Sequence, residues 1–543
     1  MLVTAKIISY LKIQMSLQSA SVKRSCGSTN SYTCHPNPVA VTFENHLHLC
    51  DVAASRHRAD NRNASKMPFI KFTLMVTVVS VLTAFYSIVY QTFLSLKQFQ
   101  KVSTILTGLL AIEGIARTDK PRVAVGYGSC TDLLIRATKF LNFTDAALNI
   151  GPDFTVDDIT NEEEFIQSFA YYFKSGAAAE RFISDEKLFK QLISIATTKP
   201  KDDITWALGG NAPVMGIRFF KEGADVLLAA RMSEKLRKHL PDGLKLAGDL
   251  VNEDDIHFIL EYKSGEEWGP YTAPRANRYI LHNDKNNPHI SSLELFDEAL
   301  ANYNPRLLVV SGLQMMDSYK FAQGVRESRL EKVQKQISSQ SESTLVHFEM
   351  ASYVEIELLR LLSKHVIPYV DSIGMNEQEL DNLQQVLTTG KIRFASDSNP
   401  RVATALDQMR KLFSLINKNY LINKRLEPKR RMLTRVHVHT LAYQAVMVVK
   451  GSQWNNTKSA AAKASLTAHR YVCGTENLED AKVPERIELD PKNPVACWDE
   501  SMTITDELIE YEVCLAPVLV CRLAKQTAGA GDNISASGLV MQI

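Results

Sequence analysis

Two hydrophobic patterns divide the chain. Residues 72–90 form one apolar run, FTLMVTVVSVLTAFYSIVY, without a charge, proline or glycine. From about Arg122 onward, short β-rich apolar runs alternate with longer amphipathic stretches. This alternation predicts an α/β fold with a parallel sheet, in which ligands bind at the carboxyl ends of the strands. The predicted strands are 123–125, 226–228, 257–260, 307–310, 345–348 and 517–520, and the predicted helices include 293–302, 355–364 and 376–387.

The apolar run has the length of a membrane-spanning helix, which needs about 20 residues. No convincing cleavage site follows it, so we expect a signal anchor over 67–96 rather than a removed signal peptide. A buried core helix is the alternative. Lysines before the run favour a cytoplasmic N-terminus and place the rest of the chain in the lumen, which predicts the endoplasmic reticulum membrane or lumen, or secretion if the anchor is cleaved. Residues 1–66 are polar and aperiodic, which predicts a disordered leader, and Met67 is a candidate start.

Composition and net charge limit which kinds of ligand or partner the chain is expected to bind. The chain has 543 residues, of which 45% are hydrophobic, and a net charge of only +2, so no strong field points to nucleic acid. The eight cysteines contain no C-x-x-C pair that would suggest a metal site. Near the C-terminus a disulfide and buried thiols are both open interpretations for Cys473, Cys497, Cys514 and Cys521.

The segment Thr527–Asp532, TAGAGD, carries the clearest candidate chemistry. It follows a predicted strand and precedes the helical run 533–540. Glycines let backbone N–H groups approach a phosphate at a helix N-terminus. A carboxylate beside such an anion site suits a base that deprotonates a hydroxyl during phosphoryl transfer. The alternative is a glycine-rich turn capped by an aspartate.

Two further carboxylates are candidates for holding magnesium. Glu379 lies three residues after Asn376, which is also the spacing of a helix capping box. In the functional interpretation it holds a hydrated magnesium ion near nucleotide phosphates. Glu349 follows His347 in a strand and shares its face, so it is a second candidate; a surface glutamate at a strand end is the alternative.

Short polar and glycine-rich segments are candidates for binding the two substrates. Asp132 ends the segment GYGSCTD after the first strand, and Gly209, Gly210 and Asn211 form a second segment; both suit sugar recognition, although each alone is commoner as a turn. The segment Arg435–Thr440 predicts a strand or loop lining a nucleotide pocket, because a zinc site would need further ligands that the sequence does not show.

The order of these segments resembles the ribokinase-like sugar kinases, and the intervening sequence is similar to the eukaryotic ADP-dependent glucokinases. The resemblance covers about Arg122 to Ile543. The stretches that carry it are GAAAERF (176–182), ILEY (259–262), GEEWG (265–269), APRANR (273–278), SGLQMM (311–316), NEQEL (376–380) and RVHVHT (435–440).

The resemblance implies a three-layer α/β/α large domain with a smaller discontinuous α/β lid, drawn from about 133–200 and 253–285, within a kinase domain of 97–543. It also implies a monomeric enzyme that uses ADP and magnesium to convert glucose to glucose 6-phosphate, with AMP as the second product. The alternatives are an ATP-dependent sugar or nucleoside kinase and a weakly active sugar or nucleotide sensor at the membrane.

Site roles follow from the resemblance residue by residue. Asp532 would be the base, with the amides of Gly529, Ala530 and Gly531 around the transferred phosphoryl group. Glu349, Glu379 and Asp532 would position Mg²⁺. Glucose would face Asp132, Glu180, Gly209, Gly210 and Asn211. The nucleotide would lie near His437, His439, Val520 and Asn376.

Overall fold

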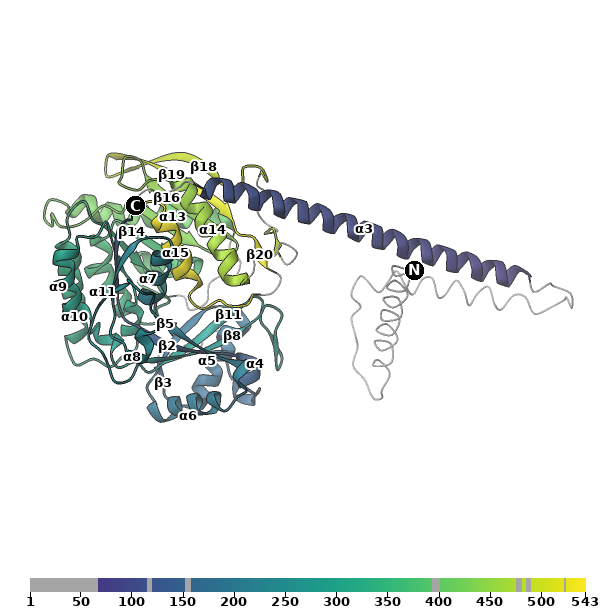
Figure 1. Ribbon diagram of the computed structural model, residues 1–543, viewed down its shortest axis with the longest axis horizontal. Helices are drawn as coiled ribbons and strands as arrows, with labels where there is room; N and C mark the ends of the chain where they lie inside the picture. Colours follow the sequence, from purple (N-terminus) through teal and green to yellow (C-terminus); the bar gives the residue numbers. More distant parts are fainter. Residues whose placement is uncertain are drawn as a thin grey trace. The chain divides into compact units, whose positions relative to one another are not determined.

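The computed structural model describes residues 67–543 except 115–119, 152–157, 393–400, 475–480, 485–489 and 522–523, with side chains from residue 74 onward. The expected leader 1–66 lies outside the described residues. Two units are distinguished, Met1–Val89 and Tyr90–Ile543. The second unit contains both large sheets (Figure 1). It also contains all of the predicted site residues.

In the described residues, the large sheet consists of ten strands, which are β1 (Arg122–Gly126), β6 (Asp225–Ala229), β7 (Lys245–Ala247), β12 (Leu307–Val310), β13 (Leu345–Glu349), β14 (Ser372–Met375), β15 (Arg435–His439), β16 (Tyr443–Val449), β18 (Ala496–Ile504) and β19 (Glu507–Pro517). Their order is β18-β19-β16-β15-β14-β13-β12-β1-β6-β7. The strands from β15 to β7 are parallel, and β16, β19 and β18 continue the sheet with antiparallel pairing. The carboxyl ends of the parallel strands therefore meet at one edge.

Helices cover both faces of this sheet and make two hydrophobic cores. One face packs against α9 (Leu293–Tyr303), α10 (Val325–Ser338), α11 (Ile356–His365), α12 (Glu377–Thr389) and α13 (Val402–Asn423). The other packs against α7 (Asn211–Lys221), α14 (Thr457–Cys473), α15 (Ala530–Val540) and the part of α3 (Met67–Glu113) that belongs to the second unit. The predicted α/β class with a three-layer large domain is confirmed.

A second sheet provides the smaller layer. Its described strands are β2 (Cys130–Arg136), β3 (Asp158–Ile159), β4 (Ala179–Ile183), β5 (Ile204–Gly209), β8 (Ile256–Tyr262) and β11 (Asn277–His282), in the order β3-β4-β11-β8-β2-β5. One face packs against α4 (Ala137–Phe140), α5 (Glu162–Ser175) and α6 (Glu186–Thr197). Because side chains alternate along a strand, residues between the core positions point to the opposite face, away from these helices. That face carries the polar residues of the site.

Predicted elements and observed elements differ at two boundaries. The predicted strand 517–520 is wrong as one strand: β19 ends at Pro517, opposite Tyr443 where its partner β16 begins, and β20 (Val520–Cys521) pairs instead with β17 (Ala481–Lys482). The predicted helix 533–540 begins earlier, at Ala530, so the TAGAGD segment enters the first turn of α15.

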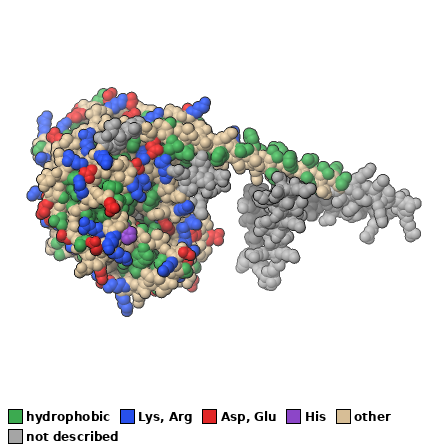
Figure 2. Space-filling view, viewed as in Figure 1, with side chains coloured by type: hydrophobic (Ala, Val, Ile, Leu, Met, Phe, Trp, Pro, Cys, Tyr) green, Lys and Arg blue, Asp and Glu red, His purple; other side chains and the backbone are tan. Residues whose placement is uncertain are grey.

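Helix α3 combines two environments. It is the one described helix long and apolar enough to span a membrane, and its apolar side chains from Leu74 to Leu96 are largely exposed, as the green side chains along the helix in Figure 2 show. Further along, the part within Tyr90–Glu113 packs into the second unit: Val102, Ile105 and Leu109 are buried.

We expect that replacing Val102, Ile105 and Leu109 together by alanine prevents stable folding of a fragment that begins at Lys97. Each large-to-small change in a core costs about 1 to 5 kcal/mol, and the sum approaches the whole stability of an ordinary domain. Thermal melting of the purified fragment measures the loss. The matched control replaces Leu94, Leu96 and Phe99, which are exposed, in a longer fragment; an equal loss there would contradict the prediction.

Candidate active site

A cavity of about 620 Å³ lies between the carboxyl edge of the large sheet and the polar face of the second sheet. Its lining comes from both layers, including Glu180 of β4, Arg278 of β11, Glu349 at the end of β13, Glu379 of α12 and Asp532 of α15. The predicted residues Asn211, Asn376, His439, Val520, Gly529, Ala530 and Gly531 also line it. The candidate base, metal ligands and most of the substrate residues are therefore brought together.

The segment TAGAGD forms the start of α15. Gly529 is the N-cap and has φ of 71°, a left-handed conformation that suits glycine. The amide of Ala530 donates to the carbonyl of Thr527 (3.2 Å), so it is already engaged. The following amides belong to the first turn, where helices leave N–H groups without intrahelical acceptors. The segment thus offers an anion site, carried mainly by the turn after Ala530.

Asp532 lies in this first turn and faces the cavity. Burial raises the pKa of Asp532 to about 7, and the charge of Glu349 acts in the same direction. Asn211, at the start of α7, opposes this by donating from Nδ2 to Asp532 Oδ1 at 2.9 Å, and Gln314 Nε2 donates to Asn211 Oδ1 at 2.5 Å. A carboxylate with this pKa can exchange a proton near neutral pH.

Glu349 is buried and hydrogen-bonded on both oxygens, so the surface interpretation is wrong. Its Oε2 interacts with His347 Nε2 (2.8 Å) and accepts from Ser535 Oγ (2.6 Å), while its Oε1 interacts with His439 Nε2 (2.8 Å). Burial opposes ionisation, but His439 and His347 hold the pKa of Glu349 well below its ordinary value. Glu349 is therefore a fixed negative charge at the cavity wall.

Glu379 forms the capping box that its spacing allows and also lines the cavity. The capping box is present: Asn376 accepts from the amide of Glu379 (2.9 Å), and Glu379 Oε2 accepts from the amide of Asn376 (2.8 Å). The carboxylate also lines the cavity, where burial raises its pKa to about 7. Helix capping therefore places Glu379 at the site.

The sugar candidates form a buried charge network on the polar face of the second sheet. His257 of β8 lies between three carboxylates: Nε2 is 3.1 Å from Asp284 Oδ2, Nδ1 is 3.8 Å from Glu180 Oε1, and Asp132 also contributes. Burial opposes protonation, but these charges raise the pKa of His257 to about 10. Burial raises the pKa of Asp132 to about 6. Gly209 packs against this carboxylate so closely that a Cβ there would lie 1.9 Å from Asp132 Oδ1.

Not all candidates reach the cavity lining. Asp132, Gly209 and Gly210 are not among the lining residues, whereas Glu180 and Asn211 are. His437 is buried in β15 with Nε2 3.1 Å from Gln444 Oε1, and of the two histidines only His439 lines the cavity.

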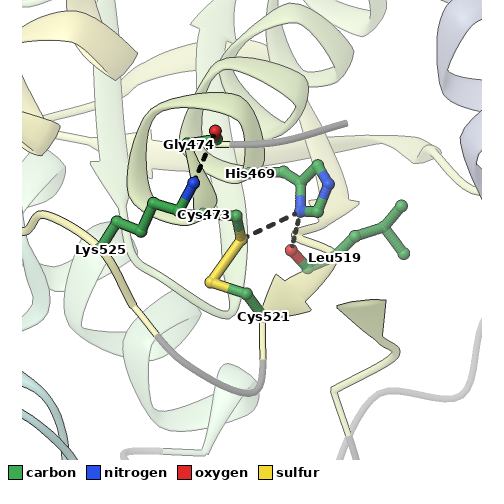
Figure 3. Close-up of a disulfide and its surroundings, with 6 residues drawn as sticks. All are labelled: His469, Cys473, Gly474, Leu519, Cys521 and Lys525. Atoms are coloured by element: carbon green, nitrogen blue, oxygen red, sulfur yellow. Dashed lines mark hydrogen bonds between the residues drawn. A yellow bond between two sulfur atoms is a disulfide. The ribbon is translucent and has the colours of Figure 1, made fainter. Parts of the chain in front are cut away.

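One disulfide forms part of the cavity wall near Val520. Cys473, at the end of α14, is bonded to Cys521 of β20, as Figure 3 shows, and both residues line the cavity. His469 Nδ1 lies 2.7 Å from the carbonyl oxygen of Leu519, which ties the same helix to the same segment (Figure 3). A second disulfide, Cys497–Cys514, joins β18 to β19. The question left open by the sequence is answered by two disulfides in the described residues.

Two residues of the cavity region were missed by the sequence reasoning, His257 and Arg278. Strand alternation was the available signal: Phe258, Leu260, Tyr262, Tyr279 and Leu281 are core positions, so the residues between them face the cavity side. Arg278 lines the cavity, and its charge lowers the pKa of both Glu379 and Asp532.

The donor set suits a divalent cation. Glu349, Glu379 and Asp532 line one cavity, where burial raises the pKa of Glu379 and Asp532 and the negative charge of Glu349 adds to both shifts; a bound cation would offset this charge. Carboxylate oxygens are the ligands that Mg²⁺ prefers, commonly through water.

Comparison with known proteins agrees with this geometry. The chain is 32% identical over 437 residues to the ADP-dependent glucokinase of Bos taurus, which covers 77% of this chain and 84% of the relative. It is 26% identical over 445 residues to the probable ADP-dependent glucokinase of Caenorhabditis elegans, with coverage of 77% and 84%. A solved ADP-dependent kinase in complex with fructose-6-phosphate and ADPβS shares the fold, with a TM-score of 0.56, 18% identity, and coverage of 81% of this chain and 97% of that one.

The family model for the ADP-specific phosphofructokinase/glucokinase conserved region matches residues 121–541, which include every predicted site residue. The resemblance inferred from the sequence is confirmed. The chain therefore belongs to the ADP-specific phosphofructokinase/glucokinase family, whose members are ADP-dependent sugar kinases.

Proposed function

We propose that this protein transfers the β-phosphoryl group of ADP to the 6-hydroxyl of D-glucose, giving glucose 6-phosphate and AMP. The observation that carries the proposal is the placement of Asp532 in the first turn of α15, across one cavity from Glu180. The carboxylate of Asp532 suits a base that takes a proton from a hydroxyl, and Glu180 suits binding of an uncharged sugar. The relatives named as glucokinases support the choice of acceptor.

In this proposal Asp532 takes the proton of the attacking hydroxyl, and Asn211 holds one of its oxygens in place. The amides at the start of α15 and the guanidinium of Arg278 stabilise the negative charge of the phosphoryl group during transfer. Glu349, Glu379 and Asp532 would hold Mg²⁺, which when bound neutralises phosphate charge. Closure of the second sheet over the cavity as a lid would exclude water and suppress hydrolysis of ADP.

The nucleotide would occupy the part of the cavity beside His439, Val520 and the Cys473–Cys521 disulfide. Its phosphates would then point toward the start of α15, since anions bind well at helix N-termini. Asn376 lines the same region through its cap on α12.

The test is an activity panel of donors against sugars, with ADP and ATP as donors and glucose, fructose 6-phosphate and ribose as acceptors. The proposal predicts turnover with ADP and glucose in the presence of Mg²⁺. Turnover with ATP alone would reject the donor, and preference for fructose 6-phosphate would reject the acceptor. Binding of glucose without turnover by any donor would indicate a sensor.

We expect Glu180→Ala to lower kcat/KM for glucose by about 10- to 100-fold, since a charge-assisted hydrogen bond contributes about 1.5 to 3 kcal/mol. The same change should raise kcat/KM for fructose 6-phosphate, because the negative Glu180 opposes a sugar that carries a phosphate. Steady-state kinetics with both sugars measure the switch. Glu180→Gln separates the two effects, since it keeps a hydrogen-bonding group and removes the charge. Unchanged selectivity in both variants would contradict the prediction.

We also propose that α3 anchors the enzyme in the secretory pathway, with the catalytic unit in the lumen of the endoplasmic reticulum. The exposed apolar side chains of α3 and the two disulfides support this placement. Asn142 and Asn455 are exposed and lie in glycosylation sequons. We expect an endoglycosidase to increase the mobility of the cell-expressed protein, and Asn142→Gln with Asn455→Gln to abolish the change. An unglycosylated chain that proteases digest in intact microsomes would contradict the lumenal placement.

A further inference from the structure

One face of strand β8 touches both halves of the proposed site. His257, Ile259 and Glu261 alternate with the core residues Phe258, Leu260 and Tyr262, so they share the cavity-side face. His257 lies against Glu180, which suits the sugar. Ile259 packs in a small cluster with Ala528. The strand therefore runs from the proposed sugar site to the catalytic loop, which we define as Thr527–Asp532.

Glu261 makes the polar contact at the far end of this face. Its Oε1 accepts from the amide of Thr527 (2.9 Å) and from the hydroxyl of Thr527 (3.2 Å), and the amide of Ala528 lies at 3.5 Å. These donors come directly before Gly529, the N-cap of α15. Glu261 Oε1 of the second sheet thus binds the hydrogen-bond donors of the segment directly before Asp532.

The large domain contacts the next peptide group of the loop. Tyr471 of α14 donates its hydroxyl to the carbonyl of Ala528 (2.7 Å), and Gln526 Nε2 donates to Tyr471 Oη (2.8 Å). The amides of the loop are therefore bound by the second sheet and a carbonyl of the loop by the large domain. A hydrogen bond to a charged acceptor is stronger than one to a neutral acceptor, so losing Glu261 removes the strong polar contacts between the loop and the second sheet and leaves the packing of Ile259 on Ala528 to hold the loop there.

We propose that Glu261 is a positioning residue that fixes the catalytic loop relative to the second sheet. Asp532 and the amides at the start of α15 are then held in the correct position relative to the sugar that this sheet binds. This inference rests on the proposed function. Phosphoryl transfer depends on the placement of the acceptor hydroxyl against base and phosphate, and a displacement of about 1 Å can cost about 100-fold in rate. Glu261 acts through the backbone of the loop and touches neither substrate in this role.

The experiment compares Glu261→Ala with Glu266→Ala in the full chain. Glu266 is a matched control, since its Oε2 accepts from the amide of Lys263 (2.7 Å) and its other oxygen from the hydroxyl of Thr138, all within the smaller layer. We expect Glu261→Ala to lower kcat by about 100-fold with KM for the sugar changed less than about threefold. Glu266→Ala should keep kcat within about threefold of the wild type.

Two further measurements separate positioning from folding. Glu261→Gln should recover at least about tenfold of the lost kcat, because its amide oxygen still accepts from Thr527. Hydrogen exchange should show faster exchange of the Thr527 and Ala528 amides in Glu261→Ala than in Glu266→Ala. If Glu261→Ala does not fold, Thr527→Val, which removes one donor to Glu261, should lower kcat several-fold with KM unchanged.

Equal kcat in the two alanine variants, or unchanged exchange of the loop amides, would overturn the inference. So would a rise in KM at constant kcat, which would make Glu261 a binding residue. The reference rate is that of the wild type on the sugar and donor it uses in the activity panel. A wild type inactive on every pair contradicts the proposed function, whereas an active wild type that is indifferent to Glu261 contradicts only this inference.

Discussion

Asp532→Asn is expected to lower kcat for phosphoryl transfer from ADP to glucose by about 10³-fold, within the range that a positioned general base contributes. Asparagine keeps the size of the side chain and can accept from Asn211, but it cannot take a proton. Folding should be preserved or improved, because the variant removes a buried charge that Glu349 disfavours. Steady-state kinetics and thermal melting measure the two effects.

Ser537→Ala is the control on the same helix, since its buried hydroxyl bonds only to the carbonyl of Ile534 among the described residues. The pH profile gives a second check. With the pKa of Asp532 at about 7, the base is protonated below this pH, so kcat/KM of the wild type should rise as pH increases through about 7. In Asp532→Asn this rise should be weaker, because of the two cavity-lining carboxyl groups with a pKa of about 7 only Glu379 remains. Near-normal turnover in the variant would show that another group is the base.

Arg278→Met should lower kcat by about 10²- to 10³-fold, the loss seen when one donor to a developing negative charge is removed. Arg278 is the cation on the second sheet that faces Asp532 and Glu379, and its Nε has no hydrogen-bond partner in the part of the chain that the structure describes. A guanidinium that lines the cavity beside these carboxyl groups suits a phosphate oxygen.

Arg278→Lys should recover part of the rate, since lysine restores the charge without the forked donors. Arg275→Met serves as the comparison: its guanidinium is already bound to Glu377 (2.6 Å) and to the carbonyl of Gly176 (2.8 Å), so a fall of less than about tenfold is expected. Single-turnover kinetics separate loss of transfer from loss of ADP binding. Equal falls in the two methionine variants would show that general charge, rather than the position of Arg278, matters.

The fold class could be predicted from the sequence because the spacing of apolar residues along the chain reflects which positions are buried. Runs such as Leu307–Val310 are apolar at every position and become central parallel strands covered on both faces. The ends of individual strands and helices were harder to predict from the sequence. The end of β19 depends on where its partner begins, and the start of α15 depends on Gly529 adopting a left-handed conformation. Both are tertiary or backbone properties that composition does not reveal.

Cavity-lining residues were easiest to predict where a local sequence motif marks them. Asp532, Glu349 and Glu379 were each placed by a local segment, and the topology brings them together. His257 and Arg278 were harder because each stands in an ordinary strand, and their role depends on which face of the second sheet meets the cavity. His437 shows the converse: a motif residue can point into the core, where it bonds to Gln444.

The cavity is lined by segments that lie far apart along the chain, so it is complete only late in folding. Cys497 and Cys514 meet within the hairpin of neighbouring strands β18 and β19, whereas helix α15, with Asp532, must pack against the distant helices α7 and α14. Such non-local contacts form slowly, so the polypeptide should collapse and oxidise well before it can turn over substrate. Recovery of enzymatic rate after dilution from denaturant should therefore lag behind recovery of the circular dichroism of the helices.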